Sequence, residues 1–344
     1  MQTQDPQLDR SAPPDPTEAG PYRAEAAPPP PSLKRKIKNV GKRGLRTLFE
    51  IGQRFGVDVL PRHFYSEIPD IRDLRRNGDW KRPHSMVGVR GADTGVQFDF
   101  LESCCPQGLV AELSRRNVFR DACSANGEPG FSLVDADFLY CFIRSVRPEK
   151  IVQVGCGVST SVMRIAAEGS QDYRPEIVCI EPYPTDFLKA AARSGEIRLI
   201  PEKAQQVALE ALTDLGENGF LFVDSTHTVK PGSEVNRLIL EVLPRLAPGS
   251  WVHFHDIYFP YNYQRGLLDD ELFFCNESAL LHAFLINNTA YSVRASLSML
   301  HYADPVRLGR SLPNYRPAGN DHGLRASDGH FPGSIYLQAS GRPS

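Results

Sequence analysis

Between residues 151 and 254 the chain alternates short apolar runs with longer amphipathic stretches. The apolar runs lie at 151–154, 177–180, 197–200, 220–223 and 251–254. Runs of this length, bounded by turn residues, are typical of buried parallel strands. Helical spacing fills the intervals, near 159–168, 184–193, 204–212 and 232–246. Strands that alternate with helices in this way predict a doubly wound parallel α/β sheet.

The pattern continues on both sides of this region. Downstream we expect a helix over 277–287, a strand over 291–297 and a closing strand over 334–338. Upstream, helical spacing covers 96–116 and 134–146. The second of these helices leads directly into the first predicted strand, so the sheet begins with an apolar helix packed beside it.

Composition divides the chain into four segments. Residues 1–32 contain nine prolines and one aromatic residue. They cannot bury enough apolar surface to offset the entropy of ordering, so we expect a disordered tail. Residues 33–55 predict a basic amphipathic helix, and residues 56–147 an N-terminal extension that contributes to the substrate pocket. Residues 148–340 form the predicted α/β domain.

The helix at 33–55 permits two interpretations. Its apolar residues recur at helical spacing, and Lys or Arg occupies most of the other positions. Such a helix can lie on an anionic membrane surface. Gly41, Gly44 and Gly52 each weaken it by about 1 kcal/mol relative to Ala. We favour the other interpretation, a helix docked on its own protein body with its charges solvated.

Charge and cysteine content narrow the function classes. The formal net charge is -2, which gives no reason to expect nucleic-acid binding. Residues 1–54 hold ten Lys/Arg and six Asp/Glu, which leaves 29 and 35 for the rest of the chain. No apolar run approaches the ~20 residues of a membrane span, and no secretory signal opens the sequence. Seven scattered cysteines without a C-x-x-C pair indicate reduced thiols and a cytoplasmic location.

A polar or glycine feature follows each of the five strands in the same register. These features are Gly155-Cys156-Gly157, Glu181-Pro182, Glu202-Lys203, Asp224 and His255-Asp256. Because ligands of open α/β sheets bind outside the carboxyl ends of the strands, we expect the features to meet in one site. The two glycines let the backbone turn tightly beside a cofactor, and Ser159 opens the next helix. The Glu181 carboxylate can accept hydrogen bonds from both hydroxyls of a ribose.

These motifs resemble those of class I S-adenosylmethionine-dependent methyltransferases. The matching runs are KIVQVGCGVSTSVM, VCIEPYP, FLFVDSTHTVKPGSEV and LAPGSWVHFHDIYFP, and the resemblance covers the chain from about residue 55 to 340. It implies a Rossmann-like sheet that is mostly parallel with an antiparallel closing strand. It also implies S-adenosylmethionine as the cofactor.

The resemblance assigns cofactor contacts residue by residue. The glycines of the first motif would line the methionine end, Glu181 would bind the ribose, and Glu202 to Ala204 would flank the adenine. Gln153 stands where the family usually has an acid, and its amide can still hydrogen-bond. The cofactor-binding residues that we expect are Gln153, Gly155, Gly157, Ser159, Glu181, Glu202, Ala204 and Asp224.

The residues after the fourth and fifth strands are similar to the D-x-x-H and E-D pairs of macrolide-sugar O-methyltransferases. In those enzymes the acids hold a divalent cation and the histidine is the general base. Asp224, His227 and Asp256 match this pattern, which implies that they are the catalytic residues, whereas His255 replaces a carboxylate. This replacement disfavours a hard Mg²⁺ ion and leaves a softer metal, held by Asp224, His255 and Asp256, or no metal. The alternative for His227 is a structural hydrogen bond to a backbone carbonyl.

Together these features predict transfer of a methyl group from S-adenosylmethionine to an oxygen, or less readily a nitrogen, of a small molecule. Such a reaction needs orientation of the acceptor and a nearby base, which we expect to be His227. Asp224 and Asp256 would orient this base or hold a metal. Segments 258–276 and 298–333, with the region 57–130, would form the acceptor pocket.

Two other function classes fit parts of the sequence. An NAD(P)-dependent Rossmann oxidoreductase shares the glycine motif and the acid after the second strand, but the third glycine of its motif is missing here. A non-catalytic cofactor-fold module at a membrane surface would use the 33–55 helix. The sequence names neither the methyl acceptor nor the oligomeric state.

Overall fold

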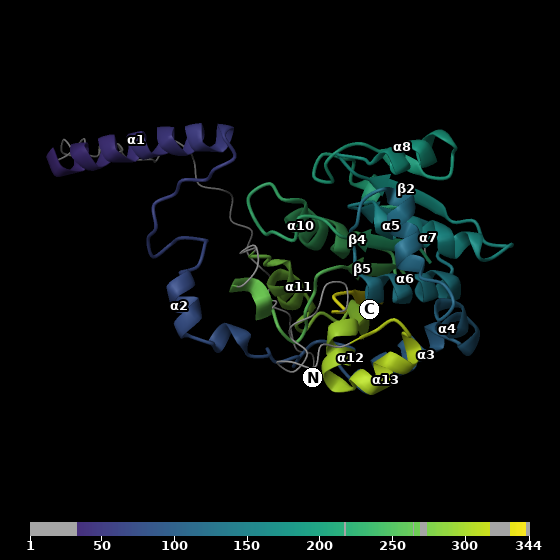
Figure 1. Cartoon of the computed structure of the whole chain (residues 1–344). Coiled ribbons are helices and arrows are strands. Elements are labelled where there is room, and N and C mark those ends of the chain that lie inside the picture. Colours follow the sequence, from purple (N-terminus) through teal and green to yellow (C-terminus); the bar gives the residue numbers. More distant parts are fainter. Residues whose placement is uncertain (1–32, 217, 264, 269–273, 317–330, 342–344) are drawn as a thin grey trace, which may run out of the picture. The chain divides into compact units, whose positions relative to one another are not determined.

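The computed structural model describes residues 33–216, 218–263, 265–268, 274–316 and 331–341. The predicted tail at 1–32 lies outside these residues. By the contacts among its residues, the chain divides into two compact units, Met1–Glu67 and Ile68–Ser344. Helix α1 (Leu33–Arg54) lies in the first unit, and the other described helices and strands lie in the second (Figure 1). No described helix combines the length and the apolar composition that a bilayer crossing requires.

Seven strands of the second unit form one sheet. They are β1 (Lys150–Val154), β2 (Glu176–Ile180), β3 (Arg198–Ile200), β4 (Phe220–Val223), β5 (Trp251–Phe254), β6 (Tyr291–Ser296) and β7 (Ile335–Ala339). Their order across the sheet is β3-β2-β1-β4-β5-β7-β6. Strands β1 to β5 are parallel, and β7 runs antiparallel to both of its neighbours. The expected Rossmann-like sheet with an antiparallel closing strand is confirmed.

Helices surround this sheet. Before β1 lie α2 (Ile71–Arg76), α3 (Thr94–Cys104), α4 (Gln107–Leu113), α5 (Val118–Asn126) and α6 (Leu133–Val146). Between the parallel strands lie α7 (Val158–Glu168), α8 (Asp186–Arg193), α9 (Glu210–Thr213) and α10 (Glu234–Arg237). After β5 follow α11 (Glu277–Leu285), α12 (Leu297–Ala303) and α13 (Pro305–Ser311).

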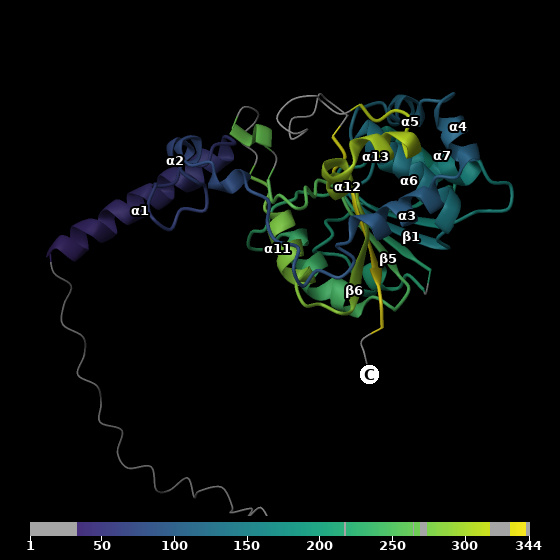
Figure 2. The same ribbon diagram turned by 90° about the horizontal axis from the view of Figure 1, so that it is seen from below.

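Alternate residues of each strand point to opposite faces of the sheet, and both faces are covered. Phe220 and Phe222 of β4 enter a core built with α3, α5, α6 and α7. Leu221 and Val223 enter a second core built with α10 and α11. In Figure 2, α3, α6, α12 and α13 gather beside one another over the first face. Because both faces are closed, polar side chains that serve a ligand are left to the ends of the strands.

The helix predicted over 96–116 is two helices. Helix α3 ends at Cys104, and Cys105 leaves the helical conformation with φ -112° and ψ 59°. The cause is Pro106, since proline has no amide hydrogen and disfavours a helical residue before it. The helix predicted near 204–212 is also shorter, because only Glu210–Thr213 forms an α-helix there.

Candidate functional site

Two cavities open at the carboxyl ends of β1, β2 and β4. One has a volume of about 280 Å³ and the other about 440 Å³. They share four lining residues, Gly155, Glu181, Tyr183 and Asp224. Three of these are strand-end residues that the sequence singled out, so the structure brings the features of three strands together around one elongated space.

Gly155 is required by the close approach of two strands. Its φ is +78°, a conformation that favours glycine, and a Cβ atom here would overlap the carbonyl oxygen of Asp224. The loop after β1 can therefore lie against the end of β4 only with glycine at this position. This packing reason adds to the cofactor approach inferred from the sequence.

The Gln153 side chain holds the loop after β1 in place through hydrogen bonds. Its Nε2 donates to the Gly155 carbonyl at 3.0 Å and to Ser159 Oγ at 2.6 Å. Its Oε1 accepts a hydrogen bond from Thr160 Oγ1 at 2.7 Å. The side chain is fully buried and lines neither cavity. This glutamine therefore shapes the loop, which is a different position from the direct cofactor contact that we expected.

Glu181 lines both cavities at the end of β2. Its Oε2 accepts from the Cys156 amide at 3.2 Å, and its Oε1 accepts from the Tyr183 amide at 2.8 Å. Each carboxylate oxygen has a second lone pair, so the group can still accept two hydroxyl donors from a ligand. The carboxylate thus joins two loops and remains available to the cavities.

Most of the expected cofactor residues lie around this space. Those that line at least one of the two cavities are Gly155, Gly157, Ser159, Glu181, Ala204 and Asp224. Glu202 lines neither, although its neighbours Lys203 and Ala204 line the larger one. The larger cavity lies toward β3, and the smaller one reaches Asn126, which sequence reasoning did not single out.

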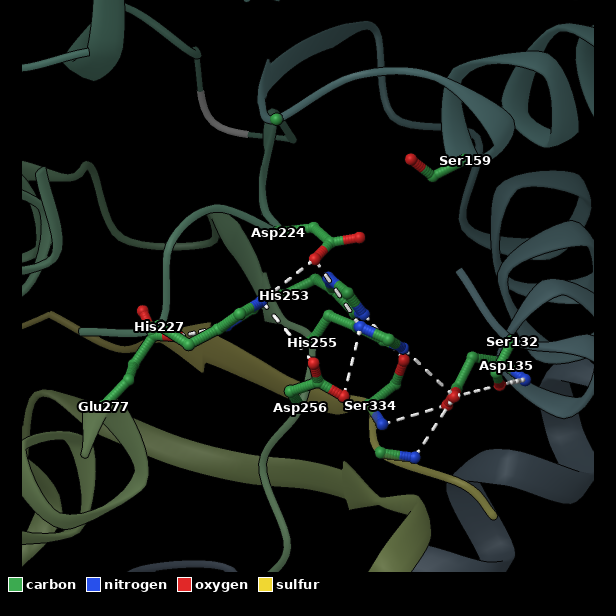
Figure 3. Close-up of polar contacts among 12 residues, drawn as sticks. Ser132, Asp135, Ser159, Asp224, His227, His253, His255, Asp256, Glu277 and Ser334 are labelled. Atoms are coloured by element: carbon green, nitrogen blue, oxygen red, sulfur yellow. Dashed lines mark hydrogen bonds and ion pairs between the residues drawn. The ribbon is translucent and has the colours of Figure 1, made fainter. Parts of the chain in front are cut away.

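Beside the cavities, His227 lies among three carboxylates (Figure 3). Its Nδ1 is 2.9 Å from Glu277 Oε2. Its Nε2 is 3.3 Å from Asp224 Oδ1 and 3.5 Å from Asp256 Oδ2. The side chain is buried. Both ring nitrogens therefore face carboxylates. The hydrogen bond to a backbone carbonyl, which was the structural alternative for His227, does not form in this arrangement.

His255 repeats this arrangement on the other side of Asp224. Its Nδ1 is 3.6 Å from Asp224 Oδ1 and 3.5 Å from Asp256 Oδ1. Its Nε2 is 3.3 Å from Oδ2 of Asp135, a fully buried carboxylate near the start of α6. The result is a chain of alternating carboxylates and imidazoles that runs from Glu277 to Asp135 (Figure 3).

The backbone conformation at His227 and Asp256 is unusual. His227 and Asp256 have φ values of 55° and 57°, in the left-handed region that side chains rarely adopt. The His227 carbonyl accepts hydrogen bonds from the amides of Asn276 and Glu277, at 3.1 and 3.2 Å. Conformations of this kind persist where surrounding contacts enforce them, and they concentrate at functional sites.

Charge in this cluster favours protonated imidazoles. Burial disfavours the charged form of His227, but its hydrogen bonds with Asp224 and Glu277 raise its pKa to about 10. Burial acts in the same direction on His255, yet the charges of Asp256 and Asp224 hold its pKa well above the usual range. Burial alone would raise the pKa of Asp224, but the charge of His255 and the bond with His227 lower it. The protonated form is therefore favoured at both imidazoles.

The predicted metal ligands take part in this same chain. Among the residues that the structure describes, no group of three or more His, Cys, Asp or Glu side chains has the arrangement of a metal site. Asp224 and Asp256 instead face the imidazole nitrogens of His227 and His255. These side chains as arranged do not fit a metal ion.

Sequence reasoning missed Asp135 and Glu277. Each lies near the start of a helix, where an acid is common because it complements the helix dipole. Asp135 also accepts the amides of Gly333 and Ser334, at 3.1 and 2.9 Å. Both partners lie far away in the sequence, so the only available signal was an acid placed within an apolar stretch.

Part of the chain resembles known proteins. Residues 152–257 match a family model described as a methyltransferase domain. An uncharacterized protein of Archaeoglobus fulgidus is 29% identical over 216 residues, which are 60% of this chain and 92% of that protein.

Two solved structures are similar at lower identity. One is the O-methyltransferase TomG of Streptomyces achromogenes, which is involved in tomaymycin synthesis and was solved in complex with SAM. It is 15% identical to this chain. The match covers 66% of this chain and 91% of TomG, with a TM-score of 0.37. The cofactor-bound protein Rv0187 of MTB is 14% identical to this chain. The match covers 65% of this chain and 90% of that protein, with a TM-score of 0.39.

The region that matches the family model lies within the sheet of the second unit. The match begins within β1, continues to the end of β5 and includes the loops that carry Gly155, Glu181, Asp224 and Asp256. Residues 152–257 of this unit are thus similar to a methyltransferase domain, over less than half of the chain. With its parallel strands and the antiparallel β7, this unit has the Rossmann-like sheet expected of class I methyltransferases.

Proposed function

We propose that this protein is an enzyme that transfers the methyl group of S-adenosylmethionine to an oxygen of a small molecule. One observation carries the proposal. Asp224 lines both cavities, and its Oδ1 also lies 3.3 Å from His227 Nε2. The Asp224 carboxylate thus lies between the proposed cofactor site and the His227 cluster, which would accept the acceptor's proton.

The cavities fit the parts of this cofactor. Glu181 can accept the ribose hydroxyls from its place between the two cavities. The larger cavity, with Ala204 on its wall, would hold the adenine, and the smaller one, beside Gly157 and Ser159, would hold the methionine part. When bound, S-adenosylmethionine supplies a methyl group on a positively charged sulfur. Asp224, an anion at the boundary of the two cavities, would stabilise that charge.

His227 is the proposed base for the acceptor hydroxyl. In the free protein it holds a proton, since its pKa is about 10. Before it can act as a base, Nε2 would release this proton to solvent, and a nearby positive charge would favour that release because like charges repel. Glu277 at Nδ1 keeps Nε2 directed toward Asp224 and Asp256. Nε2 is thus the atom that would accept the acceptor's proton, and Asp256 would orient it.

The other function classes have less support. A nicotinamide-dependent oxidoreductase does not account for the methyltransferase model that matches residues 152–257. A non-catalytic module does not account for two imidazoles held among four buried or half-buried carboxylates, one of which, Asp224, lines both cavities. The seven cysteines are unpaired, which supports a reduced, cytoplasmic environment.

Calorimetric titration with S-adenosylmethionine, S-adenosylhomocysteine and NAD tests the cofactor. We expect the first two to bind and NAD to give no heat. Binding of NAD alone would refute the proposal. A turnover assay with and without chelator then tests the metal: we expect no change, and loss of activity that one divalent ion restores would show that Asp224, His255 and Asp256 bind a metal.

A further inference from the structure

We propose that residues 33–65 form a docking surface for an anionic membrane surface. This segment belongs to the first unit and takes no part in the cavities or the His227 cluster. The inference is therefore independent of the proposed methyl transfer. It rests on two properties of the segment, exposed apolar side chains and a strong excess of positive charge.

Seven large apolar side chains are exposed within residues 48–65. They are Leu48, Ile51, Phe55, Val57, Leu60, Phe64 and Tyr65. The described residues of the much longer second unit expose only seven more. Phe55, Phe64 and Tyr65 are 80%, 94% and 84% exposed. Exposed apolar groups at this density mark an interaction surface. The alternative of a helix docked on its own protein body stays a prediction.

Positive charge precedes these apolar side chains directly. The sequence of α1 contains eight Lys or Arg residues and one acid, Glu50. Arg46 forms an ion pair with that acid at 2.8 Å, and the helix sequence has no second acid to offset the other positive charges. A bilayer with anionic headgroups offers negative charge at its surface and apolar depth just below, which matches both properties of this segment.

The docking is interfacial. Helix α1 is not apolar enough to cross a bilayer. A basic helix followed by exposed aromatic side chains instead lies in the plane of the interface, where aromatic rings reach the headgroup level. Neither the charge nor the apolar side chains would suffice alone, so removal of either should weaken binding.

Vesicle sedimentation with the full chain tests this proposal. We expect binding to vesicles of phosphatidylcholine mixed with phosphatidylglycerol and little binding to phosphatidylcholine alone. Raising salt from about 0.1 M to about 1 M shortens the Debye length from about 10 Å to about 3 Å and should release the protein. Equal binding to neutral and anionic vesicles, or none to either, would overturn the proposal.

Two triple variants separate the two properties. F55A/F64A/Y65A should lower the partition coefficient about tenfold or more, and K38Q/K42Q/R43Q should do the same. Matched controls in the second unit are V87A/L240A/V306A, which removes exposed apolar groups, and R120Q/R193Q/R198Q, which removes exposed charges. Both controls should bind as the unaltered chain does.

A partner other than a membrane would give different results. If the surface joins two copies of this chain, the aromatic triple variant would change the sedimentation equilibrium mass without vesicles. If it binds nucleic acid, the basic variant alone would lose binding to DNA or RNA. Either result, together with unchanged vesicle binding in both variants, would overturn the membrane assignment.

Discussion

His227 Nδ1 lies 2.9 Å from Glu277 Oε2, although fifty positions separate the two residues in the chain. The loop after β4 carries the histidine, and the first residue of α11 carries the acid. The same two segments are joined through the backbone, because the Glu277 amide donates to the His227 carbonyl. If His227 is the base, such a pair would fix which imidazole nitrogen faces the acceptor, as a carboxylate does for the histidine of a catalytic triad.

Replacing His227 tests the proposed base. His227→Ala should lower turnover by roughly 10²–10⁴-fold, the usual contribution of a positioned base. Affinity for S-adenosylhomocysteine should hardly change, since His227 does not line the two cavities. Steady-state kinetics and calorimetry measure the two quantities. The exposed His84→Ala is the control, and full activity of His227→Ala at every pH would move the base assignment to His255.

The pH profile tests the partner of that base. Because a base must be unprotonated and the pKa of His227 is raised to about 10, turnover should rise as pH increases above neutral. Glu277→Gln keeps the shape of the side chain and removes its charge, so the His227 pKa should fall. The rise in turnover should then shift to lower pH by about one unit or more. An unshifted profile with reduced protein stability would mean that Glu277 is only structural.

Cofactor affinity tests Glu181. Glu181→Ala should weaken S-adenosylhomocysteine binding by roughly 1–3 kcal/mol, the cost of leaving ribose hydroxyls unpaired. Glu181→Gln separates this role from the loop contacts, since a single amide oxygen remains to accept hydrogen bonds. The control is Glu176→Ala, an exposed acid at the other end of β2. Equal affinities in calorimetry for Glu181→Ala and the unaltered chain would remove Glu181 from the site.

Gly155 and Gly195 form a matched pair for backbone strain. Their φ values are +78° and +77°, but a Cβ at Gly155 would overlap the Asp224 carbonyl, whereas a Cβ at Gly195 has no neighbour within 4 Å. Gly195→Ala should cost about 1 kcal/mol of unfolding free energy, and Gly155→Ala about 3 kcal/mol or more with loss of cofactor binding. Denaturant unfolding measures both. Equal losses would show that the approach of β1 and β4 can relax.

The sequence identified the strand ends because strand and helix patterns are local. The apolar run 220–223 ends at Asp224, and the fold places such ends at one edge of the sheet. Gly155, Glu181 and Asp224 could therefore be predicted to meet. The prediction of one helix over 96–116 was wrong at Cys105-Pro106. The apolar residues keep helical spacing past Pro106, but an α-helix cannot continue through a proline in its interior.

What the sequence determined by itself is the sheet, its site edge and the identity of Asp224, His227 and Asp256 as a group. Only the tertiary structure decided which acid pairs with each histidine of the site. Asp135 reaches His255 from a helix that precedes β1, and Glu277 reaches His227 from α11. The same folding placed Gln153 against the loop after β1 and outside the lining of the two cavities, whereas the sequence predicted a cofactor contact. The physical reason is range: periodicity and turn chemistry act over a few residues, whereas the pKa of a buried imidazole depends on whichever charges the fold packs against it.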